Sequence, residues 1–166
     1  MASVHLSAGN QAEADRQRQL AERTRNHAHD RYTKATGLLR DGRLDEATIL
    51  FDEVLEMIAA RPDSYRAAIQ QHVARSYFEL SYFAEAAVSA QKAVEVFDGL
   101  SEAHFELGVF LLATGDLSSS DKVFQNAVRS FGGRGHAKSL LSQLAGHGIQ
   151  PKAAKRAIEL YFGERE

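Results

Sequence analysis

A pattern of small and large residues recurs along the chain at a nearly constant period. Each copy has a small residue, then an aromatic or small residue four positions later, then a third residue three positions beyond that. A pair of short helices cannot bury its apolar face alone, so recurrence at this period predicts stacked helix pairs that share one core. The four copies are Ala47, Phe51 and Val54; Ala86, Ala90 and Ala93; Ser120, Phe124 and Ala127; and Ala154, Ile158 and Tyr161, with successive offsets of 39, 34 and 34 residues.

Two further positions precede each copy of the pattern. The nearer one is a turn position, where the chain should reverse between two helices, and glycine is favoured there because it tolerates unusual backbone angles. The farther one holds a small residue, which lets the two helices of a pair approach closely. The expected turn positions are Gly42, Ser81, Gly115 and Ile149, and the expected close-packing positions are Ala35, Ala74, Gly108 and Ser142.

The local sequence favours helices and no strands. Pro62 and Pro151 are the only two prolines, and the chain between them is rich in good helix-forming residues. Apolar residues are spaced by three and four, as they are from Ala47 to Ile58, and no stretch alternates steadily between apolar and polar residues. Glycines punctuate the sequence where these helices should end. The chain is therefore expected to be all-α.

The period and the small–large–small spacing resemble tetratricopeptide repeats. The resemblance covers residues 32–131 well and residues 135–162 poorly; no tryptophan opens a first helix, and the first unit has five extra residues near 59–64. The resemblance implies a right-handed superhelical array of antiparallel helix pairs, an α-solenoid, with three repeats and a degenerate fourth or capping pair. The domains expected on this basis are a polar N-terminal arm at 1–29, partly helical or disordered; three helix pairs at 30–134; and the fourth pair at 135–166.

The composition argues against several other classes of protein. The absence of cysteine excludes disulfides, cysteine-ligated zinc and thiol catalysis. A net charge of −2 provides no overall attraction to nucleic acid or to an anionic membrane. Residues 1–10 do not resemble a secretory signal, and no apolar stretch approaches the roughly 18 residues that cross a bilayer. We therefore expect a cytoplasmic protein with no nucleic-acid partner and no membrane insertion.

No motif in the sequence indicates catalysis or a cofactor. The glycine-rich segment at 132–135 lacks the lysine and the serine or threonine of a nucleotide-binding loop, so we interpret it as a linker between helices. His27 and His29 are two residues apart, and on a helix they would point to different sides, which makes them a poor metal-binding pair. We expect no enzyme activity, no cofactor and no metal.

The resemblance also implies where a partner would bind. In tetratricopeptide repeats the first helix of each pair lines a concave groove, and the matching positions here combine aromatic, aliphatic and charged residues. The implied groove residues are Tyr32, Thr36, Gln71, Arg75, Phe78, Glu79, Glu102, Phe105, Glu106, Val109 and Leu112.

The charges at these positions bear on the choice of partner. Some tetratricopeptide domains bind the acidic tails of heat-shock chaperones through lysine, asparagine and arginine side chains. Here Glu102 and Glu106 occupy the positions of the late lysine and arginine, while Tyr32 and Thr36 occupy those of the early lysine and asparagine. Because carboxylates repel an acidic tail, we expect instead a peptide or helix with apolar and basic character.

Two functions remain open. The first is a protein–protein interaction module, such as a scaffold, adaptor or assembly factor. The second is a dedicated small chaperone that holds an extended segment of a client, since bacterial secretion chaperones of similar size carry three such repeats and an N-terminal helix. A homo-oligomer formed through the N-terminal arm or the groove is also compatible with the sequence.

Overall fold

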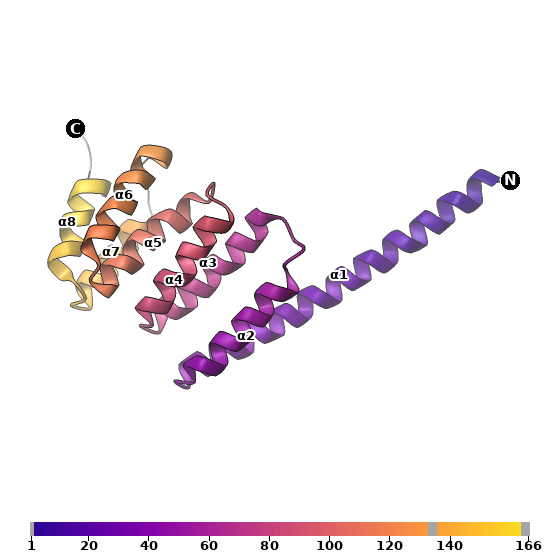
Figure 1. Cartoon of the computed structure of the whole chain (residues 1–166), viewed down its shortest axis with the longest axis horizontal. Helices are drawn as coiled ribbons and strands as arrows, with labels where there is room; N and C mark the ends of the chain where they lie inside the picture. Colours follow the sequence, from indigo (N-terminus) through magenta and orange to yellow (C-terminus); the bar gives the residue numbers. More distant parts are fainter. Residues whose placement is uncertain (1, 133–135, 164–166) are drawn as a thin grey trace. The chain divides into compact units, whose positions relative to one another are not determined.

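The computed structural model describes residues 2–132 and 136–163, with side chains from residue 11 onward. Eight helices and no strand occur in these ranges, which confirms the all-α expectation (Figure 1). None of the described helices is both long and apolar enough to cross a membrane. The helices are α1 (Ala2–Arg40), α2 (Leu44–Met57), α3 (Asp63–Glu79), α4 (Phe83–Val96), α5 (Ser101–Thr114), α6 (Leu117–Phe131), α7 (His136–Gly146) and α8 (Pro151–Phe162).

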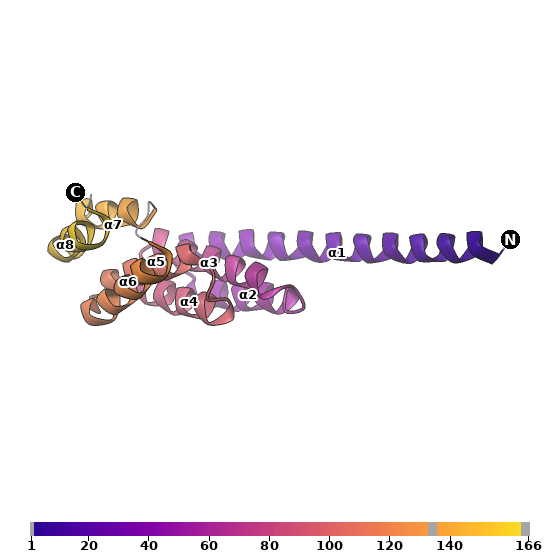
Figure 2. The same cartoon turned by 90° about the horizontal axis from the view of Figure 1, so that it is seen from above.

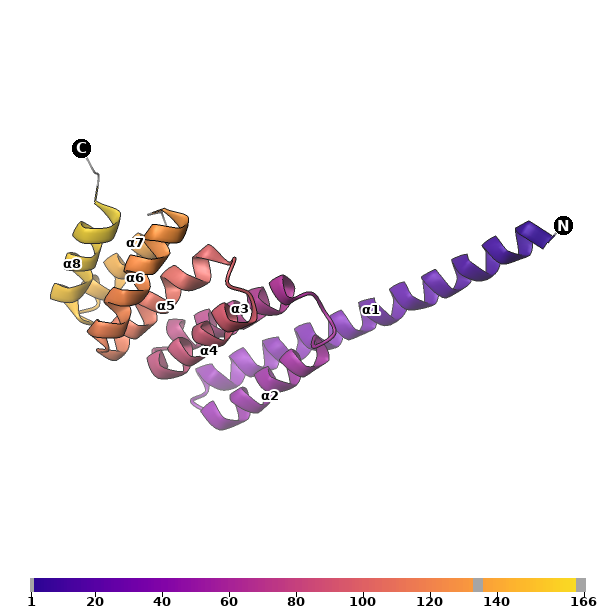
Figure 3. The same ribbon diagram turned by 45° about the horizontal axis from the view of Figure 1, so that its top comes forward.

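The chain divides into two compact units, residues 1–60 and 61–166, which are described separately. In the first unit, α1 continues without interruption past residue 29, where the sequence suggested that a polar arm ends. Figure 3 shows α2 alongside the C-terminal part of α1. The rings of Tyr32 and Phe51 lie 5.5 Å apart there, and Arg31 pairs with Glu53 across the two helices. The N-terminal part of α1 lies beyond this contact.

The second unit contains α3 to α8. Helices α3, α4 and α5 each pack on the next helix along the chain, while α7 packs on α8 and also contacts α5, and α8 contacts α6 (Figures 1 and 2). Its core contains Val73, Phe110, Phe124 and Leu141, all of them almost fully buried. The expected boundary between residues 134 and 135 lies outside the described residues.

The first helix of every pair ends in the same backbone motif. A residue with positive φ follows the helix, and the next N–H donates to the carbonyl five residues before it, which satisfies an otherwise free helix carbonyl. The positive-φ residues are Gly42 (76°), Ser81 (67°), Gly115 (92°) and Gly148 (75°). The matching bonds are Arg43 to Leu38 (2.9 Å), Tyr82 to Tyr77 (2.9 Å), Asp116 to Leu111 (3.0 Å) and Ile149 to Leu144 (2.9 Å).

The fourth turn differs from the one expected from the sequence. The left-handed residue is Gly148 rather than Ile149, and an additional residue, Gln150, adopts φ 46° before α8 begins. In the first three pairs the close-packing residue lies seven positions before the left-handed one, and the same distance in the fourth pair leads to Leu141, which is fully buried. Ser142 is exposed and donates to the carbonyl of Lys138, so its expected close-packing role was wrong.

The second helices begin with local signals. Asp116 precedes α6, and its carboxylate accepts a hydrogen bond from the backbone N–H of Ser119 at 3.0 Å. That bond lowers the pKa of the Asp116 carboxyl. Pro151 occupies the first turn of α8, where its missing N–H is not needed. These signals fix where α6 and α8 start, and hence which residues face α5 and α7.

Candidate partner-binding site

A cavity of about 680 Å³ lies within the second unit, with walls from α3 and α7 and a floor from α5; we call it the α3/α7 cavity. This volume falls in the range of roughly 300–1,000 Å³ that ligand sites usually occupy. Six of the lining residues are apolar and the others are polar or charged. The lining residues are Arg75, Phe78, Glu79, Ser81, Phe83, Phe110, His136, Leu140, Gln143, Leu144, His147 and Ile149.

Three phenylalanines form the aromatic part of the cavity. The ring of Phe78 stacks on that of Phe110 with centroids 4.6 Å apart and is tilted against Phe83 at 5.6 Å. Phe110 is fully buried, whereas Phe78 is only half-buried. Phe110 therefore holds Phe78 in place, and Phe78 offers aromatic surface to whatever enters the cavity.

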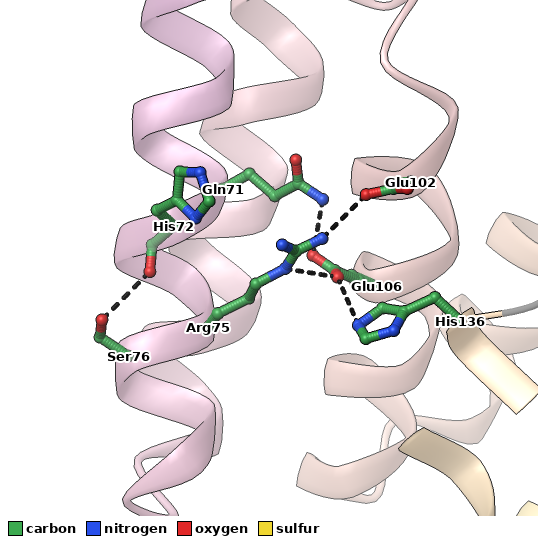
Figure 4. Close-up of polar contacts among 7 residues, drawn as sticks. All are labelled: Gln71, His72, Arg75, Ser76, Glu102, Glu106 and His136. Atoms are coloured by element: carbon green, nitrogen blue, oxygen red, sulfur yellow. Dashed lines mark hydrogen bonds and ion pairs between the residues drawn. The ribbon is translucent and has the colours of Figure 1, made fainter. Parts of the chain in front are cut away.

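Beside this cavity, a buried carboxylate joins three helices, as Figure 4 shows. Glu106 of α5 is only 1% exposed, and its two oxygens accept hydrogen bonds from Gln71 Nε2 at 2.8 Å and Arg75 Nε at 2.7 Å. His136 Nε2 of α7 lies 3.3 Å from the Glu106 Oε1 atom. Arg75 also reaches Glu102 at 2.9 Å through its terminal nitrogen. We call Gln71, Arg75, Glu102, Glu106 and His136 the Glu106 cluster.

The electrostatics of this cluster follow from its burial. Loss of hydration raises the pKa of the Glu106 carboxyl above its ordinary value, and Gln71, Arg75 and His136 oppose this shift without cancelling it. Burial by itself lowers the pKa of Arg75, but the attraction and hydrogen bonds of Glu106 and Glu102 outweigh it, so the pKa is raised. The Arg75 guanidinium is thus a fixed positive charge whose hydrogen bonds are directed at its own protein.

The lining of the cavity carries one positive and one negative side chain, Arg75 and Glu79. Arg75 is already paired with Glu102 and Glu106 of the adjacent cluster. Glu79 is exposed, and no ion pair joins it to another residue in the part of the chain that the structure describes. A ligand with a basic group would therefore find a carboxylate at the cavity that is not already paired.

The structure brings together some of the sequence-predicted groove residues. Arg75, Phe78 and Glu79 line the α3/α7 cavity, and Gln71, Glu102 and Glu106 belong to the adjacent cluster. Tyr32 and Thr36 lie in the other unit, on α1, where both are partly buried; the Tyr32 ring packs on Phe51, and the Thr36 hydroxyl donates to the carbonyl of Thr33.

Five of the expected groove residues offer little accessible surface: Gln71 and Glu106, which belong to the Glu106 cluster, and three apolar residues. Phe105, Val109 and Leu112 are buried in the second unit, with Val109 fully inaccessible. Phe105 is covered by the C-terminal part of the chain, since the Phe162 ring of α8 lies 5.7 Å from its own. Phe105 contributes to the wall of a smaller cavity of about 250 Å³ next to Glu106 and His136, but it offers little free surface.

Sequence reasoning missed the residues that α7 contributes. Leu140, Leu144 and His136 line the cavity, but the fourth copy of the repeat was placed one position out of register, and no binding residue was assigned from it. Phe83 and Phe110 were also missed. Phe83 is the first residue of a helix and Phe110 lies within an apolar run, and residues at such positions usually belong to the hydrophobic core. The apolar spacing of Leu140 and Leu144, four residues apart, was the available signal.

No group of three or more histidine or acidic side chains suited to hold a metal ion occurs among residues 2–132 and 136–163. The segment at 132–135 was interpreted as a linker; Gly132 follows α6 with φ 75°, and the rest of the segment lies outside the described residues. No family model matches the chain, and no curated protein sequence matches it either. A function is therefore inferred from its own residues.

Proposed function

We propose that the chain is a tetratricopeptide-like helical-repeat module that binds a segment of another protein at the α3/α7 cavity. The observation that carries the proposal is the cavity itself, with the half-buried Phe78 ring beside the unpaired carboxylate of Glu79. The recurrent backbone turn at the end of α1, α3, α5 and α7 supports the repeat interpretation, because it reproduces the sequence period in the backbone. The proposed activity is binding, without catalysis or a cofactor.

The chemistry of the partner follows from the walls of the cavity. Phe78 would make the main contact with an apolar side chain, and the cavity-facing edges of the buried Leu140 and Leu144 would complete its surroundings. Burial of such a side chain provides most of the affinity at protein interfaces. Glu79 would attract a lysine or arginine next to it, which mainly increases the association rate and the selectivity. We propose a partner segment, helical or extended, that carries an apolar anchor with a basic neighbour.

The experiment is affinity capture from the native host, followed by measurement of Kd for the captured partner with purified variants. Phe78→Ala should weaken binding about 30-fold, as expected for an aromatic hot spot worth about 2 kcal/mol. Tyr65→Ala is the matched control, because Tyr65 lies on the same helix, is 42% exposed and is not part of the cavity wall.

Charge reversal tests the basic part of the partner. Glu79→Lys should slow association and reduce its dependence on salt, since it removes the attraction of the cavity for a basic group. Glu95→Lys, on the exposed side of α4, makes the same change in net charge away from the cavity and should leave Kd nearly unchanged. A partner that binds the folded Phe78→Ala and Glu79→Lys variants as tightly as the wild type would contradict the proposal.

A dedicated chaperone of the secretion-chaperone type is the second candidate. The N-terminal part of α1, which precedes the contact with α2, favours a chaperone function. Secretion chaperones have a similar layout, with a helix before their repeats. The two functions differ in the state of the partner. If the captured partner is stable and folded alone, the chain acts as an adaptor or scaffold; if the partner aggregates or is degraded without the chain, it acts as a chaperone.

A further inference from the structure

A second cavity, of about 460 Å³, lies between α6 and α8; we call it the α6/α8 cavity. Its deeper wall includes Phe124 and Ala157, which are buried. Leu117 and Leu160, which also line it, are exposed by 45% and 52%. Apolar surface thus continues from the cavity onto the two helices beside it, and contiguous apolar surface of this kind often marks an interaction site.

The unpaired charges at this cavity are positive, opposite to the unpaired carboxylate of Glu79 at the α3/α7 cavity. Lys152 and Arg156 are four residues apart on α8, so they project from the same side of the helix, and both line the cavity. Neither forms an ion pair with a residue in the described ranges. The single carboxylate of the wall, Asp121, already accepts a hydrogen bond from the hydroxyl of Tyr161.

We propose that the α6/α8 cavity is a docking surface for an acidic protein segment. The segment would insert an apolar side chain between Leu117 and Leu160 and place a carboxylate against Lys152 and Arg156. A peptide fits better than a small amphiphile, because the exposed leucine surface extends outside the cavity and only a longer ligand can cover both parts.

This surface is independent of the proposed function. No residue is shared between the walls of the two cavities, and the two favour ligands of opposite charge. A chain with both surfaces would bind a basic and an acidic partner segment at the same time, as an adaptor protein does.

The test is an NMR titration of the ¹⁵N-labelled full chain with two synthetic peptides. One peptide is acetyl-Glu-Glu-Leu-Phe-Glu-Glu-amide, and the other has lysine in place of every glutamate. The acidic peptide should shift the amide resonances of Leu117, Ala153 and Leu160, and the effect should weaken as salt is added. The lysine peptide should leave these resonances unchanged.

Variants with matched controls locate the site. Arg156→Glu should weaken binding of the acidic peptide about tenfold, and Leu160→Gln about fivefold. Lys155→Glu reverses a charge at the adjacent position outside the cavity, and Val88→Gln changes an equally exposed aliphatic residue on α4; both should bind like the wild type. Glu79→Lys should also leave this binding intact, which separates the result from the fate of the α3/α7 cavity.

Four outcomes would overturn the proposal. The first is an equal response to the lysine peptide, and the second is an equal loss of affinity in Lys155→Glu. The third is a shift of the cavity resonances with protein concentration in the absence of peptide, which would identify a second copy of the chain as the occupant. The fourth is binding of octanoate but not of the acidic peptide, which would identify a site for a small amphiphile.

Discussion

Gly108 of α5 lies so close to Phe124 of α6 that a β-carbon on Gly108 would fall 2.8 Å from Cε1 of the phenylalanine ring. The Ser120 hydroxyl donates to the Gly108 carbonyl at 2.7 Å, which holds the two helices at this separation. Phe124 is itself 1% exposed, and its ring packs on those of Tyr161 and Phe162, so a displacement of the ring would disturb both contacts.

Gly108→Ala should therefore lower the free energy of unfolding by about 1–3 kcal/mol, since overpacking outweighs the better helix propensity of alanine. Gly146→Ala is the control, because a β-carbon at Gly146 would meet no atom within 4 Å. Chemical denaturation followed by circular dichroism measures both. Equal stability of the two variants would contradict the close approach of α5 and α6.

Ser81 offers a site for stabilisation. It has φ 67° in the turn after α3, where the other three turns have glycine. A left-handed conformation costs a residue with a β-carbon roughly 1 kcal/mol, so Ser81→Gly should raise the free energy of unfolding by up to about 1 kcal/mol. Ser142→Gly, in the exposed middle of α7, should instead lower it by about 0.5–1 kcal/mol. If the melting temperatures of Ser81→Gly and Ser142→Gly shifted in the same direction, the left-handed conformation of Ser81 would be contradicted.

Phe105 is expected to matter for stability and not as a free binding residue. It is 5% exposed and packs against Phe162, so Phe105→Ala should cost about 3 to 5 kcal/mol through lost contacts and the remaining cavity. Phe131→Ala removes a ring that is 37% exposed and should cost about 1 kcal/mol. A Phe105→Ala protein as stable as the wild type would show that α8 does not cover this position.

The two carboxylates bound to Arg75 should differ in their contribution to stability. Glu106→Ala leaves Arg75 Nε and Gln71 without their acceptor inside the protein and should cost about 2–4 kcal/mol. Glu102→Ala removes a side chain that is 61% exposed and should cost less than about 1 kcal/mol. A double-mutant cycle with Arg75→Ala measures each coupling, and equal couplings would contradict the buried position of Glu106.

The raised pKa of Glu106 predicts a pH dependence of stability. In the interval between the ordinary carboxyl pKa and the raised one, the folded state binds more protons than the unfolded state. The contribution of Glu106 is therefore fully present below the ordinary pKa and falls as pH rises through the raised value. The free energy of unfolding of the wild type, minus that of Glu106→Gln, should decrease over this interval. An increase over the same interval would mean that the Arg75 interaction outweighs burial.

The helices and most of their turns follow from the local sequence. The features involved are local: good helix formers, a glycine or serine at the end of the first helix, and a small–large–small stripe on the second. At Gly42 and Gly115 the expected turn residue is the left-handed one, because a residue without a β-carbon adopts that conformation at little cost. The stripe at Ala86, Ala90 and Ala93 is buried as expected, since its spacing places all three on one side of α4.

Which residues of the first helices remain accessible depends on how the helices pack against one another. Arg75 and Glu106 are 31 positions apart, and Phe105 and Phe162 are 57 apart. No local sequence pattern shows that the members of either pair are in contact. Burial depends on how each helix is rotated and on what packs over it. Gln150 adds one residue between the turn and α8, so the repeat spacing counted back from Ala154 reached Ser142 instead of the buried Leu141. For the same reason, the residues of α7 that complete the α3/α7 cavity became visible only once the helices were packed.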